Sequence, residues 1–206
     1  MSVQNTGDLL TGPNFGTPGA VTGGATAASG SATTIARSDH VHSTASMPVL
    51  LASATLTSAA ASYTFSSIPS GYSNIELVSA MRTSSTSQTE QWSAVTLNSD
   101  SAANYLNQAG GATTYLYNGV APCATNGLAT SVGVGRLFII NYANTSWYKS
   151  TQLTYGNNSG SGISLGSWSP PFGVWKSTAA VTSITIATTL GDNFLTNTTF
   201  RLYGYP

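Results

Sequence analysis

The sequence predicts an all-β fold: a jelly-roll-like β-sandwich head over residues 47–206, preceded by an extended Gly/Ala/Thr-rich N-terminal arm and stem over residues 1–46. Charged residues make up only 6% of the chain, whereas long helices usually draw on Glu, Lys and Arg. Thr, Val, Ile and aromatic residues, which suit a half-buried pleated surface, are plentiful instead. Because hydrophobic residues reach 41% and the net charge is zero, most of the chain is expected to fold.

The arm and stem differ in composition from the rest of the chain. Residues 20–34 are almost entirely Ala, Gly, Ser and Thr, and such a stretch cannot bury a core by itself. It is therefore either a flexible linker or an extended stem ordered by identical neighbouring chains. Three larger apolar residues precede it: Leu9, Leu10 and Phe15. They are either an anchor that docks into a partner, with residues 1–20 as the anchoring arm and 21–46 as the stem, or part of a frayed terminus.

The first half of the head has the pattern of short strands separated by turns. Strands are expected at residues 49–56, 63–65, 74–81 and 92–97. Pro69 and Gly71 mark a turn between the second and third of these strands. In the fourth, Trp92, Ala94 and Thr96 alternate with Ser93, Val95 and Leu97, which predicts a half-buried strand with two different faces.

The second half of the head continues this pattern. Residues 136–142 form an apolar run typical of a strand buried on both faces. A long strand is expected at 146–155, followed by an exposed loop at 156–162, and two further strands at 181–187 and 199–205. About eight strands without a fixed-period repeat favour a sandwich or jelly roll over a propeller or β-helix.

The charge balance and the cysteine count narrow the range of functions. Acids and bases cancel, so the chain lacks the basic footprint of a nucleic-acid-binding or membrane-surface protein. Cys123 is the only cysteine, which excludes an intrachain disulfide and a cysteine-based metal site. No apolar run approaches the roughly 18 residues of a membrane span, and residues 1–5 lack a secretory pattern, so neither membrane insertion nor export is expected. The uncharged composition by itself also fits a secreted lectin-like domain.

Both histidines of the chain lie in one short motif, Arg37-Ser38-Asp39-His40-Val41-His42. On an extended strand, His40 and His42 point to the same side. Two nitrogens are too few for a tight site, but three chains around an axis would supply six, enough for an octahedral iron, nickel or zinc ion. The pair therefore indicates either a metal site in a homotrimer or an exposed strand that binds nothing. Asp39 either orients one ring or caps a turn.

Two parts of the chain resemble bacteriophage virion proteins. The segment from Ser31 to His42, with Ala36-Arg37-Ser38-Asp39-His40-Val41-His42 at its end, is similar to a stem motif of phage tail-fibre proteins. Residues 65–77, 97–105 and 200–204 resemble a C-terminal domain that recurs in phage structural proteins. The resemblance implies a virion component, with His40 and His42 of three chains enclosing a metal ion on the threefold axis. It implies no catalytic residues.

Enzymatic activity is not expected from the acidic residues. A glycosidase needs two carboxylates across one cleft, roughly 5 to 10 Å apart. Glu76 with Glu90, or Glu90 with Asp100, are the pairs that could meet. Each also has an ordinary interpretation: Glu76 as a solvent-facing strand residue, Glu90 as part of a polar loop, and Asp100 as part of a turn. No phosphate loop, dinucleotide fingerprint or zinc-protease motif is present.

Binding is the better-supported expectation, because the head is rich in large aromatic residues. Four of them are interpreted as loop-borne, exposed candidates for stacking on sugar rings: Tyr115, Tyr117, Trp168 and Trp175. The alternative is that these aromatics pack in the core or between subunits.

These observations lead to one functional prediction with two alternatives. We expect a homotrimeric short tail fibre or receptor-binding protein that contacts other virion proteins and attaches to a host cell-surface polysaccharide. It would be made in the bacterial cytoplasm and displayed on the surface of the virion. The alternatives are a head decoration (cement) or head-fibre protein on the capsid, and a capsule-degrading enzyme.

Overall fold

The computed structural model describes residues 47–206 except for 87–89, 108–110, 124–130, 159–162 and 166–171. Residues Pro48–Pro206 form one compact unit. The described part of this unit contains β-strands and no helices, and the strands form two antiparallel sheets. The predicted all-β sandwich is therefore confirmed.

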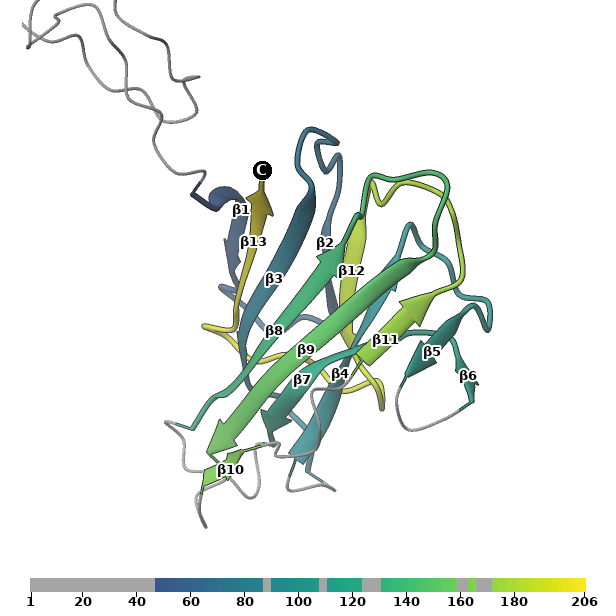
Figure 1. The fold of residues 1–206 in the computed structure, drawn as a ribbon. Helices are drawn as coiled ribbons and strands as arrows, with labels where there is room; N and C mark the ends of the chain where they lie inside the picture. Colours follow the sequence, from purple (N-terminus) through teal and green to yellow (C-terminus); the bar gives the residue numbers. More distant parts are fainter. Residues whose placement is uncertain (1–46, 87–89, 108–110, 124–130, 159–162, 166–171) are drawn as a thin grey trace, which may run out of the picture. The chain divides into compact units, whose positions relative to one another are not determined.

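The two sheets lie one behind the other, with the larger one toward the viewer in Figure 1. Its order is β1-β13-β3-β8-β9-β11-β5-β6, with β10 paired to β9. Its strands are β1 (Val49–Thr55), β13 (Thr199–Tyr205), β3 (Asn74–Met81), β8 (Gly133–Ile140), β9 (Lys149–Asn158), β11 (Phe172–Trp175), β5 (Tyr105–Asn107), β6 (Ala112–Thr113) and β10 (Ile163–Leu165). The small sheet has the order β2-β12-β4-β7: β2 (Ser62–Phe65), β12 (Ile184–Thr188), β4 (Glu90–Leu97) and β7 (Leu116–Pro122).

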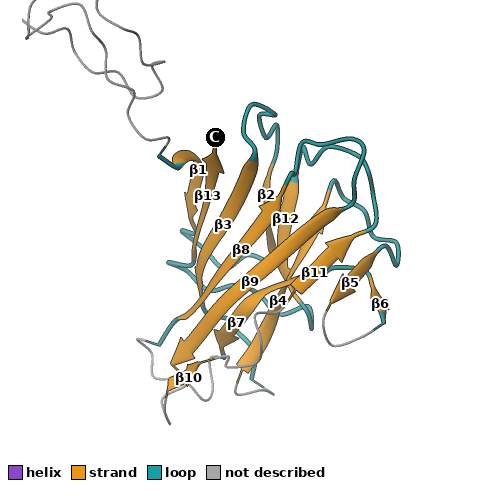
Figure 2. Cartoon of the chain, in the orientation of Figure 1, coloured by secondary structure: helices purple, strands orange, loops and turns teal. Residues whose placement is uncertain are grey.

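The connectivity is that of a jelly roll. Eight strands carry it, and their orders are β1-β13-β3-β8 in the large sheet and β2-β12-β4-β7 in the small sheet. Numbered one to eight along the chain, these orders are 1-8-3-6 and 2-7-4-5, so the chain crosses repeatedly from sheet to sheet, as two Greek keys require. Figure 2 shows that turns and loops, and no helices, make these crossings in the described residues. Strands β9, β11, β5 and β6 extend the large sheet past β8.

The core lies between the inner faces of the two sheets. Four leucines lie opposite one another on adjacent strands of the large sheet, each 2% exposed or less: Leu202, Leu77, Leu137 and Leu153. The small sheet contributes Ile184, Ile186, Val95 and Leu97 from β12 and β4. Burying one such side chain contributes about 1.5–3 kcal/mol, so this row of the core stabilises the register of four strands at once.

Strand β7 lies so close to β8 that glycine is required on β8. A Cβ on Gly133 would lie 1.8 Å from the carbonyl oxygen of Val120, and a Cβ on Gly135 would lie 1.8 Å from that of Asn118. Both obstacles are backbone atoms, which cannot rotate away. These two glycines therefore allow the sheets to close along β7.

Three details of the predicted strands are wrong. The run from Arg136 to Tyr142 is not buried on both faces: along β8, inward residues alternate with exposed or half-buried ones, because nothing in the described residues covers the outer face of the large sheet. Residues Gly156 and Asn157, expected in a loop, are buried at the end of β9. The described residues also contain thirteen strands rather than about eight.

The chain joins the sandwich at the end where it also finishes. Val49 of β1 pairs with Gly204 of β13, so Pro48 and Pro206 lie at the same end of the sheet. We call this the junction end (Figure 1). The loop at residues 141–148 also lies there, because Ile140 pairs with Asn74, whose other neighbour is Tyr205.

Candidate functional site

Four aromatic rings form a continuous row, which we call the aromatic strip: Trp92, Tyr115, Tyr117 and Tyr155. The centroid of the Trp92 ring lies 4.7 Å from that of Tyr117 and 4.8 Å from that of Tyr155. Tyr115 meets Tyr117 edge-on at 5.5 Å. All four residues are half-buried, so each keeps part of its surface open to solvent. The strip joins β4, β7 and β9 with the turn before β7.

A β-bulge brings Tyr117 to the same face as Trp92. Trp92 pairs with Val120, but the register then shifts, and Ala94 pairs with Tyr117. Without the bulge, Tyr117 would lie opposite Val95 and point into the core, because a one-residue slip moves a side chain to the other face of a strand. The extra residue thus re-aims the tyrosine, as bulges near functional sites often do.

Asn107 of β5 fixes the backbone on both sides of Leu116. Its Nδ2 donates a hydrogen bond to the Tyr115 carbonyl oxygen at 2.9 Å, and its Oδ1 accepts one from the Tyr117 backbone N–H at 3.3 Å. The Thr113 hydroxyl donates to the same Tyr115 carbonyl at 2.7 Å. The two tyrosines are therefore held in place before any ligand arrives, which lowers the entropic cost of binding.

The phenols of Tyr117 and Tyr155 stay protonated at neutral pH. Burial raises the pKa of Tyr117, and a hydrogen bond with Tyr115 adds to the shift. Burial also raises the pKa of Tyr155, and the nearby Glu90 carboxylate raises it further. A protonated phenol both donates and accepts hydrogen bonds, so the strip combines apolar ring surface with neutral polar groups.

A buried amide with unused hydrogen-bonding capacity lies next to the strip. Asn157 follows Tyr155 by two residues on β9 and so points to the same face. It is only 5% exposed, yet its Nδ2 and Oδ1 have no hydrogen-bond partner in the part of the chain that the structure describes. Leaving a buried polar group unpaired costs about 1–3 kcal/mol. A ligand that pairs with Asn157 would recover this energy.

The prediction that Trp175 is an exposed ligand-binding residue is wrong. It was expected to be exposed on a loop, but it lies in β11, is 2% exposed and stacks on Tyr105 with ring centroids 6.3 Å apart. Its indole N–H donates to Asp100 Oδ2 at 2.7 Å, which satisfies its only polar atom. Trp175 is therefore a core residue that fastens the turn containing Asp100.

The structure brings together the two predicted tyrosines. Tyr115 lies in the turn before β7, as expected, whereas Tyr117 lies in β7 itself. Sequence reasoning did not select Trp92 or Tyr155 as partners. The alternation in β4 shows which face Trp92 occupies, but no sequence signal places Tyr155, on the other sheet, against it.

The remaining predicted site residues lie outside the described residues: Trp168, His40, His42, Leu9, Leu10 and Phe15. The proposed iron, nickel or zinc site and the virion anchor therefore stay predictions. In the described ranges no group of three or more His, Cys, Asp or Glu side chains is placed to hold a metal ion. The same ranges contain no helix long and apolar enough to cross a membrane.

A second aromatic feature lies at the junction end. Trp147 and Tyr148 are 71% and 56% exposed, although the loop that carries them is firmly held. Lys149 is fully buried, and its ammonium group donates to the carbonyl oxygens of Asn144, Trp147 and Thr178. Burial lowers the pKa of Lys149. The lysine acts as an internal clamp for the loop.

Glu76 differs from its predicted role as a solvent-facing strand residue. It is 6% exposed and forms an ion pair with Arg136 of β8 at 2.7 Å. Its other carboxylate oxygen accepts a hydrogen bond from the Tyr205 hydroxyl at 2.6 Å. The pairing needs β3 and β8 to be neighbours, which a single sequence does not reveal.

Comparison of the chain with models of known protein families, with curated proteins and with solved structures finds no match.

Proposed function

We propose that this chain is a non-catalytic structural protein of a bacteriophage particle, whose sandwich head attaches the particle to a host cell-surface polysaccharide. The observation that carries the proposal is the aromatic strip beside the Asn157 amide, which has no hydrogen-bond partner among the described residues. The proposed assembly is a homotrimer whose stem is held by His40 and His42 around a metal ion. Residues 1–20 anchor it to other virion proteins.

The chemistry of the strip suits a sugar chain. The C–H faces of pyranose rings pack on aromatic faces, while their hydroxyl groups require neutral donors and acceptors. The ring surfaces of Trp92 and Tyr117 supply the aromatic faces, and the Tyr155 phenol and the Asn157 amide supply the neutral donors and acceptors. Binding sites generally combine mostly apolar walls with a few convergent polar groups in this way.

The contacts of three described carboxylates support binding rather than catalysis. Glu76 is paired with Arg136. Hydrogen bonds, the first from Trp175, hold the pKa of Asp100 below its ordinary value, so this carboxyl is a poor proton donor. Asp192 accepts a hydrogen bond from a side-chain amide at 3.0 Å. Each of these groups fastens a strand or turn.

The decisive variant is Asn157→Leu, measured in the full-length chain. We expect it to fold with unchanged or slightly higher stability, because an apolar side chain of similar size removes an unpaired polar group. On an array of bacterial capsular and O-chain polysaccharides, we expect the wild type to bind and the variant to bind about tenfold more weakly, a change of about 1.4 kcal/mol.

Tyr148→Ala is the matched control, because it removes an exposed aromatic side chain just before β9 begins, whereas Tyr155 of the strip lies toward the other end of that strand. It should leave polysaccharide binding unchanged, whereas Tyr117→Ala should weaken it. If the wild type binds no polysaccharide on the array, the attachment function is wrong. If Tyr148→Ala abolishes binding and Asn157→Leu does not, the ligand occupies the junction end instead.

The location on the particle has a separate test. Counting copies per virion distinguishes a tail fibre, present in tens of copies or fewer, from a capsid decoration protein, present in hundreds. We expect the lower number, because the proposed head presents a specific binding strip rather than a surface shaped only to clamp subunits.

A further inference from the structure

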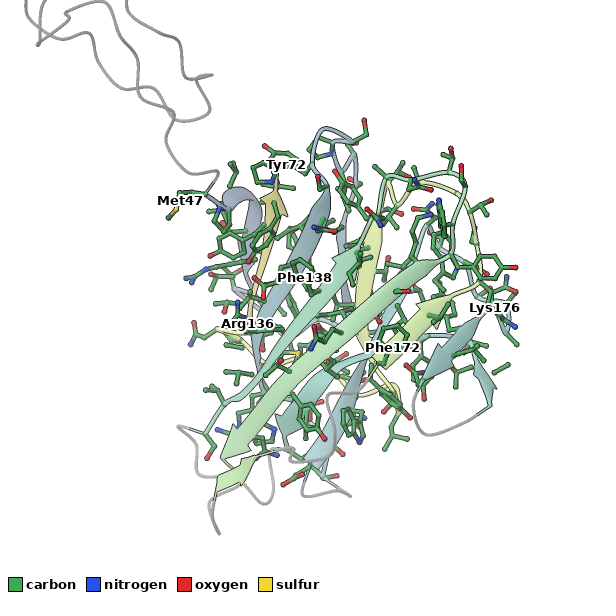
Figure 3. The ribbon with its side chains drawn as sticks, in the orientation of Figure 1. Met47, Tyr72, Arg136, Phe138, Phe172 and Lys176 are labelled. Carbon is green, nitrogen blue, oxygen red and sulfur yellow. The ribbon has the colours of Figure 1, made fainter. Side chains whose placement is uncertain are left out.

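The outer face of the large sheet contains a second polar and aromatic site. A depression of about 350 Å³ lies there, lined by Glu76, Arg136, Phe138, Gln152, Thr154 and Tyr205. The register explains the grouping, because Glu76 of β3 lies opposite Phe138 of β8, which lies opposite Gln152 of β9. Arg136 and Phe138 are two positions apart on β8, on the face turned to the viewer in Figure 3.

The floor of the depression is a buried carboxylate. The side chain of Glu76 is only 8% exposed. Its Oε1 accepts hydrogen bonds from Arg136 Nε at 2.8 Å, and its Oε2 accepts one from the Tyr205 hydroxyl at 2.6 Å. A packed apolar pair often stabilises a fold as well as a buried ion pair does, so stability alone does not account for this arrangement.

Hydrogen-bonding capacity remains in the site after these contacts. A guanidinium group has five N–H donors, and Arg136 directs only part of them to Glu76, while 60% of its side chain is exposed. A carboxylate has about four lone-pair positions, so Glu76 can accept further donors. Gln152 and Thr154, both exposed on β9, add an amide and a hydroxyl group.

Aromatic rings form the apolar wall of the depression. Phe138 and Tyr205 meet edge-to-face, with centroids 5.2 Å apart and an interplanar angle of 78°. Because the Tyr205 hydroxyl is bound to Glu76, its ring is fixed in orientation. The depression therefore places a rigid aromatic edge and face beside charged and neutral hydrogen-bonding groups.

We infer that this depression binds a neutral sugar residue through a pair of adjacent hydroxyl groups. One hydroxyl accepts from the free edge of the Arg136 guanidinium and donates to Glu76, while Gln152 binds its neighbour and Phe138 packs against the ring of the sugar. Glu76 and Arg136 cancel each other's charge, so a charged ligand gains no net electrostatic attraction here and still loses its hydration when it binds. The pair therefore favours a ligand without net charge.

This inference adds a second site to the proposed attachment function and rests on that function for its biological role, but not for binding itself. The test is saturation-transfer NMR on the full-length chain with the methyl glycosides of glucose, galactose and mannose at millimolar concentration, and with glucuronate as the anionic comparison. We expect transfer to at least one neutral glycoside and none to glucuronate.

Variants at exposed positions then locate the signal. Gln152→Ala and Thr154→Val should each reduce the transfer about fivefold, a loss of about 1 kcal/mol. Ser150→Ala is the control, since it changes the same face of β9 outside the depression. Tyr148→Ala, which lies outside both the depression and the aromatic strip, should also leave the signal unchanged.

Three outcomes would overturn the inference: no transfer to any neutral glycoside, stronger transfer to glucuronate, or a full signal in the Gln152→Ala/Thr154→Val double variant. If Asn157→Leu loses polysaccharide binding but still shows saturation transfer to the glycosides, both sites are supported. If the wild type shows saturation transfer but binds no polysaccharide, only the attachment function is wrong.

Discussion

Tyr105 connects the end of β4 to the turn that follows it through one buried hydroxyl group. It is fully buried, and its hydroxyl accepts a hydrogen bond from the Leu97 backbone N–H at 2.9 Å and donates one to the Asp100 carbonyl oxygen at 3.0 Å. Burial raises the pKa of Tyr105 to about 12, against an ordinary value of 10.0. A single phenol thus satisfies the end of β4 and the turn that follows it.

The raised pKa predicts a loss of stability in alkali. Between pH 10 and pH 12 the folded chain keeps the Tyr105 proton, whereas the unfolded chain releases it. The contribution of Tyr105 to the free energy of unfolding is complete below pH 10 and falls by about 2–3 kcal/mol as the pH rises to 12. In Tyr105→Phe this loss is absent, although the variant is about 1–2 kcal/mol less stable at pH 8 because the Leu97 N–H loses its partner. Urea unfolding of both chains should show that the difference between their free energies of unfolding is smaller above pH 11 than at pH 8. Parallel pH profiles would contradict this assignment.

At the scale of elements, β7 packs against β8 so closely that Gly135 has no room for a side chain. Gly135→Ala would place a Cβ 1.8 Å from the Asn118 carbonyl oxygen, so β7 would have to move. We expect a loss of about 3 kcal/mol or more, the upper end of overpacking effects, measured as the free energy of unfolding in urea. Gly71→Ala is the control, because no atom lies within 4 Å of the added Cβ, and its effect should stay within about 0.5 kcal/mol. Equal stability of the two variants would show that β7 moves freely.

Local patterns predicted single strands better than their surroundings. The expected strand at residues 199–205 coincides with β13, and the expected strand at 74–81 coincides with β3, because turn residues delimit both. The prediction that β8 is buried on both faces was wrong, because an apolar run does not show whether a second layer covers each face. Trp175 was misplaced for the same reason: its burial depends on pairing with Tyr105, about seventy positions earlier in the chain. The aromatic strip was found only in part, because it joins two sheets through a bulge.

The whole chain has few charged residues and no net charge, and this affects its tendency to associate. Six acidic and six basic residues cancel, and among the described ones Lys149 is buried while Glu76 and Arg136 neutralise each other. A protein with near-zero net charge tends to associate. Permanent assembly in a particle would make use of this tendency, and it agrees with the proposed homotrimer.

The proposed trimer makes a prediction about the histidine pair. If His40 and His42 of three chains bind a metal ion, the purified full-length chain should sediment as a trimer and carry about one transition-metal ion per three chains. The His40→Ala/His42→Ala variant should lose the metal and melt at a temperature lower by on the order of 5 °C, because metal binding to the folded state alone adds to its stability. Elemental analysis and calorimetry of both chains test this directly. A metal-free wild type with an unchanged melting temperature in the variant would mean that packing alone holds the stem together.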